Sequence, residues 1–257
     1  NHPNNRAPIG SGPYKLEKWD TNQQLVFVRN PDYWGKALGR EGHIDKFIWR
    51  IVLEDGAATQ LALRGELDSL PLLPKQWDVE GKLPEFEQQF NKFSYDTPSF
   101  NYIGWNQKTP FFADKRVRKA MTMFLDRETI RQKIYHGLAE NLSGCFMPGT
   151  AEYDESLAPL AFDPAAAAKL LDEAGWIDHN GDGIRDKDGK DFAFEVMLPT
   201  KAEEWQQIAT LLQEELKRAG INMTLRELEW ANMLDKVDKR SFDAVMLAWS
   251  MTPDPDM

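Results

Sequence analysis

Apolar and polar residues alternate with the two-residue period of a β-strand in the first part of the chain. The alternating runs 14–19 and 25–29 are separated by a polar turn, and this arrangement predicts a β-hairpin. Further along, good helix-forming residues at 54–64 lie between the apolar runs 44–52 and 67–70. Strand, helix and strand in direct succession predict a small α/β unit.

Three prolines and a glycine then interrupt residues 71–90, so we predict a domain boundary near residue 90. After it, an apolar aromatic run predicts a strand at 100–105, and apolar residues at helical spacing predict a helix over 114–136. The Asp-Pro pair at 163–164 predicts the start of another helix. Aspartate caps the free amides of a helix, and proline suits the first helical position.

The last third of the chain alternates between strand and helix patterns. This βαβαβ succession favours a parallel or mixed sheet with right-handed crossovers. The predicted elements are a strand at 192–198, a helix at 201–219, a strand at 221–228, a helix at 230–238 and a strand at 242–248.

The composition narrows the possible functions. Lys and Arg number 31 against 41 Asp and Glu, which gives a net charge of −10. Surfaces that bind nucleic acid need clustered cations, and the chain has no run of them, so we expect no nucleic-acid partner. Hydrophobic residues make up 42% of the chain, which is typical of a globular fold, and no apolar run is long enough to predict a membrane span.

The chain has one cysteine, Cys145, and therefore cannot form an internal disulfide. It begins without an initiator methionine and ends soon after a strand-like run. We interpret both ends as cuts within a longer protein, so the lack of a signal peptide gives no information on location. Neither Cys145 nor any of the four histidines has a neighbour at metal-site or catalytic-triad spacing. We expect no enzyme site and no cofactor.

Two predicted strands end in side chains that suit ligand contact. The first carries Tyr102, Trp105 and Asn106, and the second is followed by Trp249 and Asp254. Open α/β sheets bind ligands at the carboxyl ends of their strands, where an indole can stack on a ligand and a carboxylate can hold an ammonium. The alternative is that both tryptophans are core residues and that Asp254 belongs to a turn.

Residues 178–189 partly resemble a calcium-binding loop. Oxygen-bearing side chains stand at its first, third and fifth positions, and a glycine follows at the sixth. The twelfth position is Gly189, where the calcium motif requires a bidentate glutamate. We favour a tight connection between a helix and a strand over a metal site. The residues that a calcium ion would use are Asp178, Asn180, Asp182 and Asp186.

Several segments carry a recognisable family pattern. They are IGSGPY at 9–14, VRNPDYW at 28–34, GELD at 65–68, PFFADKRVRKA at 110–120, and DP at 163–164 with KLLDEAGW at 169–176. In this order and spacing, they resemble the bacterial extracellular solute-binding proteins of the peptide and nickel class, which include the oligopeptide- and dipeptide-binding proteins. The resemblance extends from about Gly10 to Met257, and no single motif decides it.

The resemblance implies an α/β, periplasmic-binding-protein-like fold with mixed sheets flanked by helices. Residues 1–90 would be part of lobe I, and residues 91–257 would be most of lobe II, truncated at its C-terminal end. Such a receptor closes around its ligand by a hinge motion. Because parts of both lobes would be missing, we expect the chain to fold but to bind ligand weakly or not at all.

The implied function is that of a monomeric, non-enzymatic protein that is periplasmic or extracellular, with or without a lipid anchor at full length. It would capture a peptide or similar small solute and deliver it to the membrane permease of an ABC importer. A nickel chelate, a sugar or another non-peptide solute is the alternative within the class. An α/β hydrolase or transferase is a remote alternative, because it needs a convergent catalytic site.

The resemblance also implies ligand-binding residues. Peptide-binding members carry an aspartate three residues after the strand's tryptophan, and it holds the peptide's α-ammonium. Trp249 matches this tryptophan, but Thr252 stands in the place of the aspartate. Either Asp254 takes the role, or the ligand lacks an ammonium. The other expected ligand residues, matched by position only, are Tyr102, Trp105 and Asn106.

Overall fold

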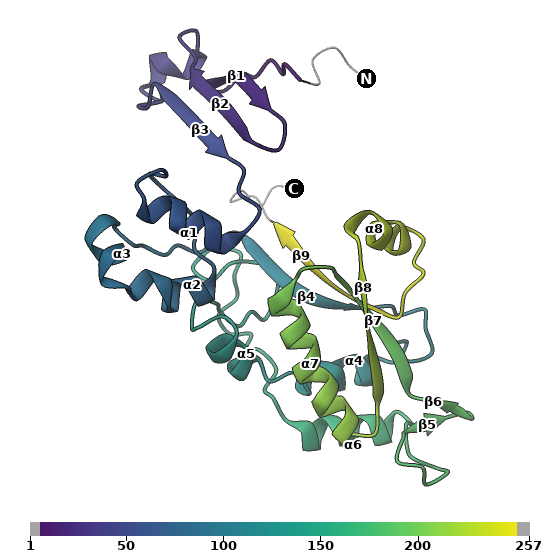
Figure 1. Cartoon of the computed structure of the whole chain (residues 1–257). Coiled ribbons are helices and arrows are strands. Elements are labelled where there is room, and N and C mark those ends of the chain that lie inside the picture. Colours follow the sequence, from purple (N-terminus) through teal and green to yellow (C-terminus); the bar gives the residue numbers. More distant parts are fainter. Residues whose placement is uncertain (1–5, 251–257) are drawn as a thin grey trace. The chain divides into compact units, whose positions relative to one another are not determined.

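The chain divides into two units in the computed structural model, which describes residues 6–250 (Figure 1). The predicted boundary near residue 90 differs from this division in one segment, because Leu72–Lys82 belongs to the second unit. The first unit consists of Asn1–Pro71 and Leu83–Phe90, and the second consists of Leu72–Lys82 and Asn91–Met257.

The first unit contains a three-stranded antiparallel sheet in the order β1-β2-β3. Its strands are β1 (Tyr14–Asp20), β2 (Gln24–Arg29) and β3 (Lys46–Arg50). The predicted hairpin is confirmed, since Tyr14 pairs with Arg29 across β1 and β2. Asn22 in the connecting turn has a φ of 59°, a conformation that asparagine tolerates better than most residues.

Short helices make up the rest of the first unit. They are the 3-10 helix η2 (Trp34–Leu38), α1 (Asp55–Leu63) and α3 (Pro84–Gln89). The predicted helix at 54–64 is confirmed by α1, and Gly65 follows its end with a φ of 74°. The strand predicted at 67–70 is wrong, because no strand in the described part of the chain pairs with these residues.

A four-stranded mixed sheet in the order β4-β9-β7-β8 forms the centre of the second unit (Figure 1). β7 is parallel to both β8 and β9, whereas β4 is antiparallel to β9. The predicted βαβαβ succession is confirmed. It consists of β7 (Ala193–Pro199), α7 (Glu203–Arg218), β8 (Asn222–Leu228), α8 (Trp230–Asp238) and β9 (Ala244–Ser250). The fourth strand of the sheet, β4 (Ser99–Trp105), comes earlier in the chain.

Helices cover both faces of this sheet. On one face, Met233 of α8 packs against Met197 and Val245. The other face carries the main core, to which α4 (Lys115–Met123), α5 (Arg127–Lys133), α6 (Pro164–Glu173) and α7 contribute. The Leu72–Lys82 segment adds α2 (Pro74–Asp78) and η3 (Glu80–Lys82), so the stretch 71–90 is more regular than its prolines suggested.

The single helix predicted over 114–136 is wrong, because the chain forms two helices, α4 and α5, in this stretch. The break lies at Asp126, whose carboxylate accepts a hydrogen bond from the amide of Thr129 at 3.0 Å. An aspartate that caps a new helix competes with continuation of the previous one. The apolar spacing continued through the break and concealed it.

Asp114, the N-cap of α4, makes stability depend on pH. Hydrogen bonds from the side chain and the backbone amide of Arg116 lower the pKa of Asp114 from 3.8 to about 2. The folded-state pKa is the lower one, so this contribution is complete above pH 3.8 and is lost as the pH falls toward about 2. Asp114→Asn keeps a capping oxygen but does not titrate.

We therefore expect Asp114→Asn to reduce the slope of unfolding free energy against pH in this acidic window. Urea unfolding at a series of pH values measures that slope. Asp163→Asn, at the N-cap of α6, is the matched control. The Asp163 carboxylate accepts a hydrogen bond from the amide of Ala166 and pairs with no arginine among the described residues, so the slope for Asp163→Asn should stay that of the parent protein. An unchanged slope in Asp114→Asn would contradict the assignment.

Candidate ligand-binding site

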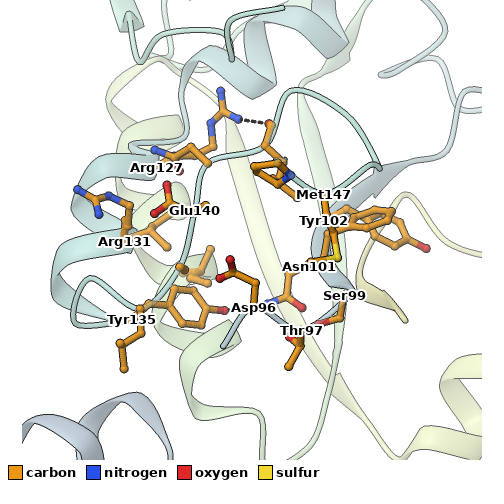
Figure 2. A pocket seen from close by; sticks show the side chains of 18 of the residues that line it. Asp96, Thr97, Ser99, Asn101, Tyr102, Arg127, Arg131, Tyr135, Glu140 and Met147 are labelled. Carbon is orange, nitrogen blue, oxygen red and sulfur yellow. Dashed lines mark hydrogen bonds between the residues drawn. The ribbon is translucent and has the colours of Figure 1, made fainter. Parts of the chain in front are cut away.

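A pocket of about 560 Å³ opens on the second unit, where the beginning of β4 meets α5, the first turns of α7 and the loop 138–148 (Figure 2). Antiparallel pairing places Ser99, the first residue of β4, opposite Ser250, the last of β9. The pocket therefore lies at the edge of the sheet where the parallel strands β7, β8 and β9 have their carboxyl ends. Open α/β sheets bind ligands at this edge.

Apolar side chains from four elements form most of the pocket wall. Ile103 comes from β4, Ile130 from α5, Ile208 from α7 and Met147 from the loop. Ile130 and Ile208 are also members of the main core, so packing fixes this part of the wall. A fixed apolar wall binds the aliphatic or aromatic part of a ligand by removing its surface from water.

The hydroxyl of Tyr135 lies within this wall and is held by a donor on β4. The Asn101 side chain donates from Nδ2 to the hydroxyl oxygen at 2.9 Å. Burial raises the pKa of Tyr135, although the hydrogen bond from Asn101 opposes the rise. The hydroxyl therefore keeps its proton at neutral pH.

Arg127, the first residue of α5, anchors the loop that closes the pocket. Its guanidinium donates to the carbonyl oxygen of Leu142, in this loop, at 3.1 Å and to that of Leu160, further along the chain, at 2.5 Å. Burial lowers the pKa of Arg127, but a guanidinium stays charged at neutral pH. Both bonds go to backbone oxygens, so this side chain holds the loop in place.

Two carboxylates, Asp96 and Glu140, also line the pocket, and Figure 2 shows Asp96 pointing into it. Arg131, the second arginine in the lining, is paired with Glu128 of its own helix at 2.9 Å. That pair raises the pKa of Arg131, and Glu140 adds a smaller contribution. Within residues 6–250, no hydrogen bond reaches the Asp96 carboxylate. The charge that remains open to a ligand is therefore negative.

The structure brings only some of the predicted ligand residues to the pocket. Tyr102 lines it. Trp105 instead packs in the core against Phe112, with ring centroids 4.9 Å apart, and Asn106 donates to the carbonyl of Phe242 at 2.7 Å. Antiparallel pairing puts Trp105 and Asn106 at the far end of β4, so their side chains support the fold. The alternative of a core tryptophan applies to Trp105.

Trp249 lies at the same end of the sheet as the pocket, where it pairs with Phe100 across β9 and β4. Its side chain is 58% exposed, so the core alternative does not apply to this tryptophan. An exposed indole at the end of a strand suits stacking on a ligand. Thr252 and Asp254 lie outside the described residues, so their role stays a prediction.

The loop at 178–189 folds as a series of tight turns. Asp178 accepts hydrogen bonds from two glycine amides at 2.7 and 3.0 Å, and Asn180 and Asp182 each accept one from the amide two residues ahead. Asp186 accepts from the amide of His179 and contacts its ring. These oxygens accept hydrogen bonds from backbone amides of the loop itself, which supports the interpretation as a tight connection between a helix and a strand. It leads into β5 (Asp186–Lys187) and β6 (Lys190–Asp191).

Other candidate chemistry is sparse in the part of the chain that the structure describes. No group of three metal-ligating side chains occurs there, and no helix there is both long and apolar enough to cross a membrane. Cys145 is exposed. His136 contacts Asp78 at 3.1 Å, so this histidine is engaged by a carboxylate.

Sequence reasoning missed Asn101, Tyr135 and Trp205, which line the pocket together. They come from β4, from the turn after α5 and from the first turn of α7, and no local motif links them. The only available signal was that Asn101 and Ile103 share a face of β4, at the two-residue period. Their meeting is a property of the fold.

One family model matches the whole chain, residues 1–257, and describes the bacterial extracellular solute-binding proteins, family 5 Middle. The chain belongs to this family. The match confirms the resemblance found in the sequence segments. The family is a class of solute-binding proteins and not of enzymes.

Individual relatives agree with the family match. Oligopeptide-binding protein AppA of Bacillus subtilis is 32% identical over 260 residues, covering 98% of this chain and 46% of AppA. The structure of AppA in complex with a nonapeptide has a TM-score of 0.77 at 31% identity and covers 98% of this chain and 49% of that one. The chain thus spans about half the length of the relatives it matches.

Two further structures confirm the periplasmic-binding-protein fold but hold other ligands. NikA from Brucella suis, in complex with Fe(III)-EDTA, has a TM-score of 0.78 at 26% identity, covering 96% of this chain and 49% of NikA. A periplasmic oligopeptide-binding protein of Thermotoga maritima, bound to mannohexaose, has a TM-score of 0.70 at 25% identity. That match covers 95% of this chain and 47% of the Thermotoga protein.

Proposed function

We propose that this chain is part of the substrate-binding component of an ABC importer that captures peptides outside the cytoplasmic membrane. One observation carries the proposal. The pocket lies at the ligand-binding edge of a sheet, in a chain that matches AppA, solved with a nonapeptide, over 98% of its length. An apolar pocket with few polar groups accommodates varied peptide side chains.

The partners and the location belong to the same proposal. The captured peptide passes to the membrane permease of the importer, and the binding protein is a periplasmic or extracellular monomer without a cofactor. The proposal also includes a lipid anchor on the full-length protein. The proposal includes no enzyme activity, in line with the family, which is a class of solute-binding proteins.

Ligand contact is assigned to Tyr102 in the pocket and to Trp249 at the same end of the sheet. Tyr102 lines the pocket, and the exposed indole of Trp249 gives aromatic contact while backbone hydrogen bonds hold the peptide. Thr252 and Asp254 follow Trp249 closely and stay in the proposal on that ground. Trp105 is left out, because it packs inside the core.

A non-peptide solute is the second candidate, because two relatives were solved with Fe(III)-EDTA and with mannohexaose. An anionic chelate fits this pocket poorly. The Asp96 carboxylate is open to the pocket, whereas Arg127 and Arg131 are engaged by backbone oxygens and by Glu128. Like charges inside a binding site disfavour a ligand of that sign. A neutral sugar meets no such repulsion.

Tryptophan fluorescence of the full-length protein tests the proposal, since Trp205 lines the pocket and Trp249 lies at the same end of the sheet. The three probes are a mixture of nonapeptides, Fe(III)-EDTA and mannohexaose. We expect a saturable change with the nonapeptides and none with the other two. Saturation by the chelate alone or by the hexasaccharide alone would assign the protein to that solute instead.

A further inference from the structure

The Tyr135 hydroxyl presents a hydrogen-bond donor to the pocket. A phenolic hydroxyl has one proton to donate and a limited capacity to accept. The Asn101 amide, at 2.9 Å, uses the accepting side of the oxygen. Among residues 6–250, no side chain or carbonyl accepts the Tyr135 proton. A half-buried donor without a partner favours a ligand that supplies an acceptor.

The direction of this donor is fixed by the fold. Asn101 belongs to β4 and Tyr135 follows α5, so the hydrogen bond between them ties the hydroxyl to a second element of the second unit. The Tyr135 ring also packs against the main core. A donor that is positioned before the ligand arrives discriminates between ligands more sharply than a mobile one. Figure 2 shows the hydroxyl pointing into the pocket.

The surroundings of the hydroxyl define what can carry the acceptor. Apolar side chains of Ile103, Ile130 and Ile208 line the same pocket, so the acceptor must sit at the end of an aliphatic stem. Asp96 and Glu140 are negative, and a carboxylate on the ligand would be repelled by them. A neutral oxygen on a short aliphatic stem satisfies both conditions.

We propose that Tyr135 is a specificity-determining residue, which donates its hydroxyl proton to a neutral side-chain oxygen of the bound peptide, such as the carboxamide oxygen of glutamine. The inference rests on the proposed peptide function and specifies the peptide class. The pocket selects peptides with an aliphatic, carboxamide-bearing side chain over those with a purely aliphatic or a carboxylate side chain.

Calorimetric titration of the full-length protein with three probe peptides tests the inference. Each probe is a nonapeptide of alternating alanine and one guest residue, namely glutamine, norleucine or glutamate. Because guest residues alternate with alanine, a guest side chain can enter the pocket in every second alignment of the peptide along the site. For the parent protein, we expect the glutamine probe to bind more tightly than the norleucine probe and the glutamate probe to bind weakest.

Tyr135→Phe removes the donor and keeps the ring. We expect it to weaken binding of the glutamine probe by about fivefold to tenfold and to change binding of the norleucine probe by less than about twofold. Tyr153→Phe, a tyrosine outside the pocket lining, is the matched control and should leave the affinities unchanged. Thermal unfolding confirms that both variants are folded.

Equal weakening of the glutamine and norleucine probes would overturn the inference, because it would assign Tyr135 a purely structural role. An unchanged preference for glutamine in Tyr135→Phe would overturn it as well. If none of the three peptides binds the parent protein, the proposed peptide function itself fails, and this result is distinct from the other two.

Discussion

Replacing Phe192 with alanine is expected to lower the free energy of unfolding of the second unit by about 3–5 kcal/mol. The Phe192 side chain is fully buried. Its ring stacks on Phe111 with centroids 5.6 Å apart and planes 4° apart, and its centroid lies 4.5 Å from that of Trp176. Alanine loses these contacts and leaves a cavity among rings that other core elements hold in place.

Urea unfolding followed by circular dichroism measures this loss. Phe93→Ala is the matched control, because the Phe93 side chain is 76% exposed and, within residues 6–250, its ring contacts only that of Tyr95. The control should change stability by less than about 0.5 kcal/mol. A loss below about 1 kcal/mol in Phe192→Ala would show that the aromatic cluster is not the centre of the core.

Replacing Arg127 with methionine is expected to cost about 2–3 kcal/mol of stability and to weaken ligand binding. The change removes two charge-assisted hydrogen bonds, to Leu142 and Leu160, and leaves both carbonyl oxygens without this donor. Methionine keeps most of the apolar stem, so packing changes little. The loop 138–148 lines the pocket and would lose its anchor.

Arg131→Met is the matched control for stability, since it changes the same helix but removes only the pair with Glu128. A partly exposed pair of this kind contributes little, so a change below about 1 kcal/mol is expected. Urea unfolding gives the stability of both variants, and hydrogen exchange at the loop amides reports its order. Equal protection of those amides in Arg127→Met and the parent would contradict the anchoring role.

Much of the fold could be predicted from the sequence, because burial imposes a period on each element. The strands around residues 196, 225 and 246 alternate or run apolar, and Gly220 ends the long helix between the first two, with a φ of 76°. Their local signals agree with the tertiary structure, and the βαβαβ order then restricts the topology.

The failures also have physical reasons. The helix break at Asp126 is set by one capping side chain, within an apolar spacing that continues past it. The direction of β4 depends on its pairing with β9, which no local pattern encodes. Because β4 runs antiparallel to β9, Trp105 and Asn106 lie at the end of the sheet away from the pocket, and Asn101 lies near the pocket. Trp249 lies near the carboxyl end of β9 and, because β9 is parallel to its neighbour β7, at the end of the sheet that holds the pocket; its contact with a ligand stays a prediction.

Native mass spectrometry of the full-length protein, purified without added ligand, tests the central claim most directly. Binding proteins of this kind retain ligand through fixed apolar walls and a small number of directed polar contacts. We predict a series of co-purified masses that correspond to short peptides, enriched in glutamine-containing sequences. A single bound mass of another chemical kind, such as a metal chelate or an oligosaccharide, would contradict the account.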